Sequence, residues 1–258
     1  MVPFLSFLSF LISYSTACDR CVHESKVAYF SEASALSSGA CGYGSMAIDF
    51  NNGYLAAAVS SLYKDGAGCG ACFQIRCKNS DLCSTIGATV IVTDLNKNNQ
   101  TDLVLSSRAF KAMAKEGRAQ DILKLGIANM EYKRVPCKYN RNLAVRVEES
   151  SQKPNYLAIK VLYQGGQTEI VAMDVAQVGY ASWGFMSRCY GAVWATSRVP
   201  TGALQFRFVV TAGYDGKWIW AQNVLPADWK PGEVCDTGVQ ITDIAQEGCS
   251  PCDERQWK

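Results

Sequence analysis

The stretches Gly39-Ala40-Cys41-Gly42-Tyr43-Gly44 and Gly68-Cys69-Gly70-Ala71-Cys72-Phe73-Gln74-Ile75-Arg76-Cys77 decide the fold class. Glycine at this density lets the backbone turn tightly and lets neighbouring segments approach closely. Cysteine at this density indicates disulfides, which hold loops that a small core cannot hold alone. The two stretches therefore predict a compact, disulfide-stabilised β domain from an oxidising compartment.

The N-terminal segment, residues 1–17, supports that compartment. It carries no charged side chain, is mostly apolar and ends in the small residues Ser15-Thr16-Ala17. The run is too short to span a membrane, and no later run is long enough. We therefore predict a signal peptide cut near Ala17 and a secreted protein without a membrane span.

Composition narrows the function classes. The chain has 258 residues, 12 cysteines and a net charge of +2. An even number of cysteines allows up to six disulfides. The small net charge provides no basic field for nucleic acid. The motif Asn99-Gln100-Thr101 predicts N-glycosylation at Asn99, which suits an exposed loop of a secreted protein.

Both halves of the chain contain short β-branched runs separated by Gly, Asn and Asp, which is typical of strands. These runs cover residues 89–93, 143–147, 157–163, 170–175 and 204–211. One helix is predicted over 107–115, with Ser106 or Ser107 as its N-cap. The polar and charged segment 141–153 is expected to link the two halves.

The second half alternates with period two, which predicts an antiparallel sandwich with one polar face. In the first run, one face would carry Leu157, Ile159, Val161 and Tyr163, and the other Tyr156, Ala158 and Lys160. In the second run, one face would carry Phe206, Phe208 and Val210, and the other Gln205, Arg207 and Thr211. This parity predicts that Tyr156 faces solvent. Aromatic residues of β domains are mostly core, so Trp183, Trp194, Trp218 and Trp220 are expected inside.

Several motifs then identify a family resemblance. The first half contains the two glycine–cysteine stretches, Val92-Thr93-Asp94 and Arg134-Val135-Pro136-Cys137; the second contains Pro154-Asn155-Tyr156-Leu157-Ala158, Tyr190-Gly191-Ala192-Val193-Trp194 and Asn223-Val224-Leu225-Pro226-Ala227-Asp228-Trp229. In this order they resemble the two domains of plant expansins over residues 27–235. The cysteine-bearing ends resemble those of the expansin-like A branch.

The resemblance implies an all-β fold: a six-stranded double-psi β-barrel over 27–138, followed by an immunoglobulin-like β-sandwich that binds carbohydrate over 152–235. Residues 236–258 would form a C-terminal extension. It also implies three barrel disulfides, Cys41–Cys69, Cys72–Cys137 and Cys77–Cys83. The remaining pair in the second half, Cys189 and Cys235, is expected to form a disulfide within the sandwich.

The resemblance further implies a secreted cell-wall protein that loosens the wall without hydrolysis and needs no cofactor. Its partners would be cellulose, xyloglucan or a related β-glucan, bound by a monomer. By motif matching, Tyr29 and Phe30 would be the aromatic pair of the barrel groove, and Asp94 and Asp102 its carboxylates. On the sandwich, Tyr156 and Tyr190 would be the planar rings on which sugars stack.

An enzymatic alternative follows from the barrel, which is similar to that of family 45 glycoside hydrolases. Such enzymes need an acid and a base. Asp102 matches the acid, but residues 26–30 offer no carboxylate for the base, and Gln100-Thr101 replace the His-Phe that precedes this aspartate in expansins. We therefore expect no enzyme. The alternatives are an endoglucanase or lytic transglycosylase with Asp102 as acid, and a protein that only docks to walls.

The terminal cysteines also allow two interpretations. Two Cys-x-x-Cys pairs, Cys18 with Cys21 and Cys249 with Cys252, together with His23 would suit zinc. Disulfides are the stronger expectation in a secreted chain. We therefore predict no metal site, with His23 as a solvated loop residue.

Overall fold

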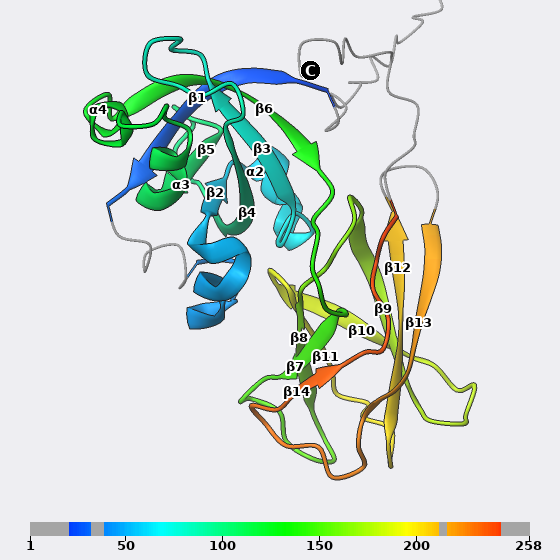
Figure 1. Cartoon of the computed structure of the whole chain (residues 1–258). Helices are drawn as coiled ribbons and strands as arrows, with labels where there is room; N and C mark the ends of the chain where they lie inside the picture. The colour runs from blue at the N-terminus through cyan, green and yellow to red at the C-terminus, as the bar shows by residue number, and fades with distance from the viewer. Residues whose placement is uncertain (1–20, 32–38, 212–215, 244–258) are drawn as a thin grey trace, which may run out of the picture.

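The structure is a computed structural model that describes residues 21–31, 39–211 and 216–243. It consists of two β domains, each with its own sheet (Figure 1). The first contains β1 (His23–Phe30), β2 (Leu55–Ala58), β3 (Cys72–Cys77), β4 (Ala88–Leu95), β5 (Leu103–Ser106) and β6 (Ile127–Val135). The second contains β7 (Ala144–Val147), β8 (Leu157–Leu162), β9 (Glu169–Gln177), β10 (Gly184–Tyr190), β11 (Val193–Thr196), β12 (Leu204–Thr211), β13 (Gly216–Leu225) and β14 (Val234–Asp236).

The first domain is a closed barrel with the strand order β1-β5-β2-β4-β3-β6. β1 pairs in parallel with β5, and β2 with β4, whereas the other pairs are antiparallel. Its interior is filled by large apolar side chains such as Phe73, Ile91 and Leu105, each no more than 1% exposed. The predicted six-stranded barrel is therefore confirmed.

Short helices close the barrel: η1 (Gly44–Gly53), α2 (Ser60–Tyr63), η2 (Lys64–Gly66), α3 (Ser107–Ala112) and α4 (Ala119–Leu123). The predicted helix is α3. Its N-cap is Ser106, whose hydroxyl accepts a hydrogen bond from the amide of Ala109 at 3.3 Å. The sequence predicted this start correctly, because a serine hydroxyl satisfies an amide that the first helical turn leaves open. The helix ends at Ala112, before the predicted end.

The second domain is a sandwich made from one eight-stranded sheet with the order β13-β12-β9-β10-β11-β8-β7-β14. The sheet divides at β10: its residues 184–186 pair with β9, while residues from Ser187 onward pair with β11. Apolar residues from both halves, including Ile159, Met173 and Phe206, form one core between them. This confirms the predicted sandwich, and Trp194 packs in its core as expected.

The predicted domain boundaries need correction. β7 lies inside the expected linker 141–153, where it pairs with β8 and β14 and buries Val145 and Val147. The linker therefore precedes residue 143, and only the polar residues after β7 connect two strands. At the other end, β14 extends past residue 235 and Ile241 is fully buried. The sandwich thus begins before residue 152 and includes part of the expected extension.

The three barrel disulfides form as the resemblance implied: Cys41–Cys69, Cys72–Cys137 and Cys77–Cys83. The predicted Cys189–Cys235 pair is wrong, and both thiols are free. Cys189 lies on β10 and Cys235 on β14, with β11, β8 and β7 between them. Four steps of about 4.8 Å make roughly 19 Å, far beyond the reach of a disulfide.

Part of the terminal prediction lies outside the described residues, namely the signal peptide, Cys18, Cys249 and Cys252. Cys21 is disulfide-bonded. His23 is not a solvated loop residue, because it lies in β1 and stacks on the ring of Tyr132 at 5.3 Å. Within the described part of the chain, no cluster of three His, Cys, Asp or Glu residues could hold a metal ion. Nor does that part contain a helix long and apolar enough to cross a membrane.

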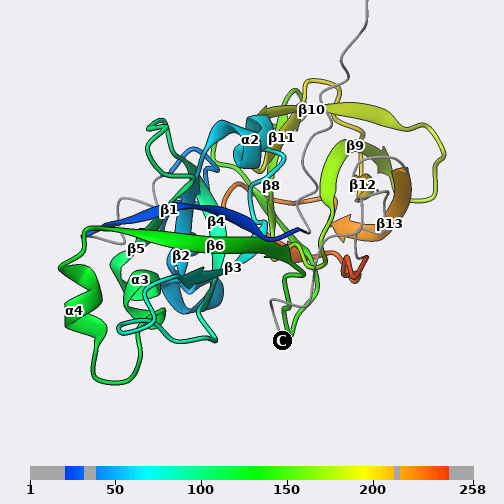
Figure 2. The same cartoon turned by 90° about the horizontal axis from the view of Figure 1, so that it is seen from above.

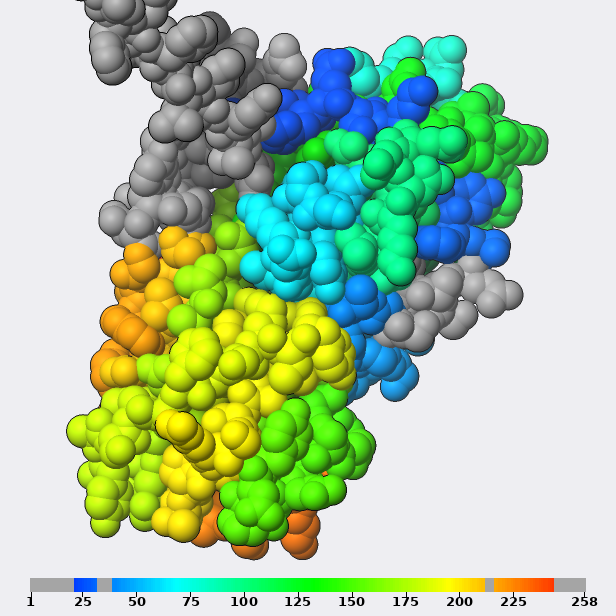
Figure 3. Space-filling model, turned by 180° about the vertical axis from the view of Figure 1, so that it is seen from behind, coloured from blue at the N-terminus to red at the C-terminus, as the bar shows by residue number. Residues whose placement is uncertain are grey.

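The two domains pack directly against each other. Seen from above, the barrel and the sandwich lie side by side, with α2 close to β10 and β11 (Figure 2). The space-filling view shows the yellow surface of the sandwich against the cyan surface of the barrel (Figure 3). This contact places the barrel loop 39–42 against β10 and β11 of the sandwich.

Candidate functional site

Asp94 lies near the end of β4 and organises the first glycine–cysteine stretch. Its Oδ1 accepts hydrogen bonds from the amides of Ala40, at 2.6 Å, and Leu95, at 2.7 Å. A side chain at residue 39 would overlap the side chain of Asp94, so this position requires glycine. The carbonyl of Ala40 accepts a further bond from the hydroxyl of Tyr63 at 3.1 Å. Asp94 therefore holds the loop 39–42 in place.

Asp102 lies directly before β5 and is half-buried. Its Oδ2 accepts a hydrogen bond from the hydroxyl of Tyr132 at 2.9 Å. β2 runs between β4 and β5, with Ala57 opposite Asp94 and Ala58 opposite Leu103. The two aspartates therefore flank the same end of β2. Each carboxylate already accepts at least one hydrogen bond from the protein.

The aromatic pair of β1 is not brought together with these aspartates. Phe30 pairs with Ser106, at the other end of β5 from Asp102. The separation is about four residues along the strands, or about 13 Å. The ring of Tyr29 packs on that of Phe110 in α3, with 4.9 Å between the ring centres, and its hydroxyl donates a hydrogen bond to the carbonyl of Leu123 in α4 at 3.3 Å. Its side chain therefore packs against these two helices. Phe30, which is 37% exposed, is the more accessible of the pair.

The predicted glycosylation motif lies in the loop between the two aspartates. Asn99 is exposed and occupies a turn. The two ends of this loop are joined by a hydrogen bond from the side-chain amide of Asn96 to the carbonyl of Thr101, at 2.6 Å. A glycan on Asn99 would therefore stand beside Asp94 and Asp102.

Tyr156 and Tyr190 share the outer face of β8, β11 and β10, which we call the tyrosine face. The predicted parity holds for the side of the sheet but not for its exposure. Ala158 lies outside the sandwich core in a small cluster with Val193 and Ala195, against which Tyr156 packs, and the three cluster residues are buried. Tyr190 is 52% exposed, whereas Tyr156 is half-buried. Tyr163, expected on the inner face, instead adopts a φ of 58° and packs against the barrel core.

The chemistry of the tyrosine face suits an uncharged ligand. Burial raises the pKa of Tyr156, and the neighbouring Cys189 raises it further. Burial, and then the charge of Glu148, raise the pKa of Tyr190. Both rings therefore stay neutral at physiological pH. The nearby charge of Lys160 is balanced by Glu148 at 3.0 Å.

The loop 39–42 joins the two parts of the site. A side chain at Gly42 would meet the ring of Tyr190 at 2.6 Å, so the tyrosine lies directly on the barrel loop. The same loop is held by Asp94 at its other end. The loop 39–42 therefore links the barrel carboxylate Asp94 to Tyr190 of the tyrosine face.

Arg188 stabilises the contact between the barrel and the tyrosine face. Its guanidinium donates to the carbonyls of Gly66 at 3.2 Å, of Gly191 at 2.6 Å and of Ile170, and it stacks over Trp194 at 4.2 Å. Burial lowers the pKa of Arg188. Because Gly66 belongs to the barrel, this one side chain ties the domains together.

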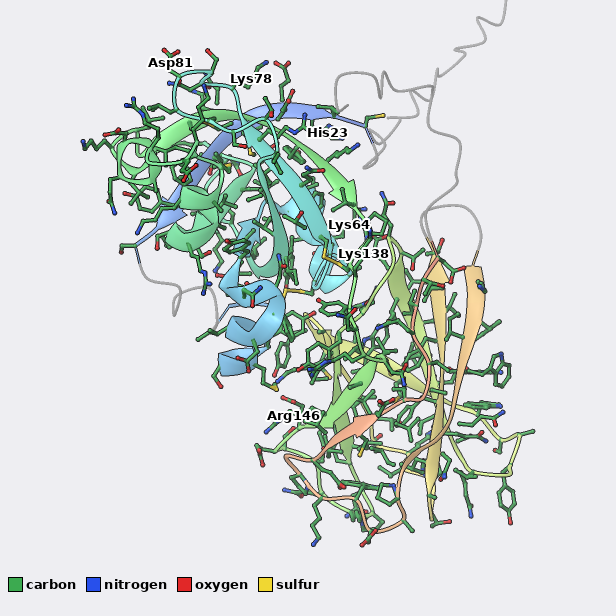
Figure 4. The ribbon with its side chains drawn as sticks, in the orientation of Figure 1. His23, Lys64, Lys78, Asp81, Lys138 and Arg146 are labelled. Carbon is green, nitrogen blue, oxygen red and sulfur yellow. A yellow bond between two sulfur atoms is a disulfide. The ribbon has the colours of Figure 1, made fainter. Side chains whose placement is uncertain are left out.

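A second contact between the domains is an ion cluster of Lys64, Arg134 and Glu169. Glu169 comes from β9 of the sandwich, whereas Arg134 and Lys64 come from the barrel. Its Oε1 contacts Nη1 of Arg134 and lies 3.0 Å from Nζ of Lys64. Figure 4 labels Lys64 at this junction. The cluster and Arg188 together hold the site surface in one geometry.

Comparison with known proteins matches both domains. The family described as "Expansin C-terminal domain" matches residues 143–226, and the family described as "Lytic transglycolase" matches residues 55–132. "Expansin-like A1" of Arabidopsis thaliana is 67% identical, covering 98% of each chain. "Expansin-like A3" of Oryza sativa subsp. japonica is 50% identical over 95% of this chain and 91% of its own. The chain belongs to the expansin family, in its expansin-like A branch.

Solved structures agree with the expansin fold. An apo expansin of Clavibacter michiganensis gives a TM-score of 0.64 at 22% identity, covering 85% of this chain and 97% of its own. A point mutant of the Clavibacter michiganensis expansin, in complex with cellohexaose, gives a TM-score of 0.65 with the same identity and coverage. At this identity the likeness concerns the fold.

One exposed feature of this expansin-like A chain escaped the sequence reasoning. Trp183, Trp218 and Trp220 were expected in the core, and this was wrong: Trp218 is 41% and Trp220 46% exposed, and Trp183 is partly exposed. All three surround the guanidinium of Arg207. The alternation along β13 could have predicted this exposure. Ala221 is buried, and Trp218 and Trp220 lie at positions of the opposite parity, which face away from the core.

Proposed function

We propose that this protein is secreted to the plant cell wall, where it binds cellulose or a matrix β-glucan and loosens the wall without hydrolysing it. The observation that carries the proposal is the contact of Tyr190 with Gly42. It makes the barrel loop and the tyrosine face one surface, on which a single extended glycan chain can contact both domains. The cellohexaose complex of the Clavibacter expansin supports an oligosaccharide of glucose as ligand.

Sugar rings present C–H faces that stack on flat aromatic rings, and such stacking needs no charge. The exposed ring of Tyr190 and the half-buried ring of Tyr156 suit this contact. The barrel contributes polar groups around Asp94 and Asp102. A bound chain would then be held away from its neighbours in the wall, which is a noncovalent way to loosen contacts between polymers.

The absence of hydrolysis is supported by the state of the two aspartates. An inverting reaction needs one carboxyl group as acid and a second as base, with room for a water molecule. Asp94 accepts two backbone hydrogen bonds and holds a loop, which is a structural task. Asp94 is therefore not available as the base that Asp102 would need to activate water.

A lytic activity is the second candidate, because the barrel matches the family described as "Lytic transglycolase". In that case Asp102 would act as the acid, and Tyr132 would orient it through their 2.9 Å hydrogen bond. A protein that docks to walls without loosening them is the third candidate.

The test combines three measurements on the same purified protein. We expect extension of isolated walls under load, binding to cellulose and no release of reducing ends from β-glucans. Tyr156→Ala and Tyr190→Ala should each weaken cellulose binding about fivefold, if a stacking contact contributes about 1 kcal/mol. Thermal melts should barely change for Tyr190→Ala.

Each result separates the candidates. Reducing ends that appear with the wild type and vanish with Asp102→Asn would show a lytic enzyme. Binding without wall extension would show a docking protein. Unchanged binding of the double tyrosine variant, with unchanged melts, would contradict the assignment of the tyrosine face.

A further inference from the structure

The outer face of β13, β12, β9 and β10 carries a second group of exposed rings, which we call the tryptophan face. In Figure 1, β9, β12 and β13 lie at one side of the sandwich, and β10 crosses from them toward β11. Its most exposed aromatic rings are Trp218, Trp220 and Phe185, the last 63% exposed. Large apolar side chains that gather on one exposed face mark a binding surface more often than they occur by chance.

The rings belong to an ordered row across the sheet. Trp220 pairs with Arg207, Arg207 with Asp174, and Asp174 with Phe185. Directly paired residues of neighbouring strands share a face. Three steps between strands make the row about 14 Å long. It therefore offers a flat ring at each end and a polar pair between them.

The tryptophans of this face are held in fixed positions. The guanidinium of Arg207 lies 4.2 Å from the ring centre of Trp218 and 4.6 Å from that of Trp183. Trp183 in turn meets the ring of Trp220 edge-on at 5.2 Å. A ligand that stacks on these rings would lose little affinity to side-chain ordering, because the rings are ordered beforehand.

The charges of the face cancel, which selects the chemistry of the ligand. Nε and Nη2 of Arg207 lie 2.7 and 2.6 Å from Oδ2 of Asp174. Flat rings beside a neutralised ion pair complement an uncharged chain that has apolar faces and hydroxyl edges. They do not complement a polyanion such as nucleic acid or an acidic glycan.

We propose that the tryptophan face is a second binding site for an uncharged β-glucan chain, independent of the tyrosine face. The sandwich core separates the two faces, since β10 joins β9 in one half-sheet and β11 in the other. One rigid domain therefore presents two glycan sites on opposite sides. Such a domain bridges two polymer chains and gains avidity on a surface that offers both. This goes beyond the proposed function, which uses the tyrosine face alone.

The binding test uses cellohexaose and microcrystalline cellulose as probes. In a Tyr156→Ala/Tyr190→Ala background, cellohexaose should still change the tryptophan fluorescence, and cellulose binding should persist. Adding Trp220→Ala should weaken that remaining binding about fivefold, by analogy with other aromatic contacts. Phe185→Ser is the second variant, because this ring is highly exposed and its loss should leave the fold intact even if Trp220→Ala does not. Ile86→Ala, at an exposed apolar residue of the barrel, is the matched control.

The bridging test uses cellulose nanocrystals in suspension. Wild-type protein should cross-link them and raise the turbidity, whereas either Phe185→Ser or Tyr190→Ala should lower the turbidity reached at the same protein concentration. The inference is overturned if Trp220→Ala and Phe185→Ser bind cellulose like the wild type with unchanged melts. It is equally overturned if these variants convert a dimer to a monomer, because the face would then be a contact between copies of the chain. Loss of binding in the tyrosine variants alone would leave the proposed function standing and would overturn this second site.

Discussion

Glu169 offers the sharpest test of how the two domains are held together. We expect Glu169→Ala to lower the free energy of unfolding by about 3 kcal/mol. The side chains of Arg134 and Glu169 are 6% and 10% exposed, so their contact is a buried ion pair. Removing one partner of a buried pair costs about 3–5 kcal/mol, because it leaves the other charge in a poorly solvating interior.

The lower end of that range applies here for two reasons. Arg134 keeps a hydrogen bond to the carbonyl of Thr168, at 3.3 Å. Lys64 is 34% exposed, so solvent screens its contact with Glu169, which adds less than about 1 kcal/mol. For a protein of this size, about 3 kcal/mol corresponds to a fall in melting temperature of roughly 6–12 °C.

The assay is urea denaturation followed by tryptophan fluorescence, together with thermal melts. Glu169→Gln keeps the shape and one acceptor, so its loss should be smaller than that of Glu169→Ala. Glu149→Ala is the control, since Glu149 is 72% exposed and pairs with Arg146 inside one domain. It should cost no more than about 1 kcal/mol.

The shape of the unfolding curve carries a second readout. Glu169 joins β9 to two barrel residues, so its loss should weaken the coupling between the domains and broaden the transition. A loss below about 1 kcal/mol, equal to that of Glu149→Ala and with an unchanged slope, would refute the argument that this buried pair stabilises the interface.

Two further predictions concern the thiols and the tyrosines. In the native protein, the thiol of Cys189 should react fast and that of Cys235 more slowly, because the first is exposed and the second partly buried. Cys189→Ser should lower the number of titrated thiols by one. An unchanged number would show that Cys189 is oxidised. Burial raises the pKa of Tyr43 and of Tyr139. A raised pKa in the folded state contributes stability that is complete below the unfolded pKa of about 10 and is lost as pH rises further. Melting temperatures should therefore hold constant up to about pH 9 and fall above about pH 10, less steeply in Tyr139→Phe; an equal fall in that variant would assign the effect to other groups.

Local sequence signals predicted the elements whose structure depends on near neighbours. The hydroxyl of Ser106 caps α3 because a cap needs only an acceptor next to the first turn. Period-two alternation predicted the inner and outer residues of β8 and β12, because a strand turns successive side chains to opposite faces. The motif resemblance also predicted the order of the two domains and the three barrel disulfides.

The same local signals failed where distant parts of the chain compete. The polar residues around β7 resembled a linker, yet pairing with β8 and β14 makes this segment a strand. Cys189 and Cys235 were assigned to each other by elimination, and the strand order keeps them apart. Trp218 and Trp220 resembled core residues by type, but their parity on β13 places them outside.

Fold class, candidate residue types and family could be read from the sequence, because glycine-rich turns, cysteine spacing and period-two alternation are local features. Which of the candidate residues meet depends on the tertiary structure. Asp94 and Tyr190 are 96 positions apart, yet both contact the loop 39–42. Tyr29 and Asp102 belong to one barrel and lie apart, because strand register sets their positions along its axis. Proximity between such residues arises from strand pairing and domain packing, which no short stretch of sequence encodes.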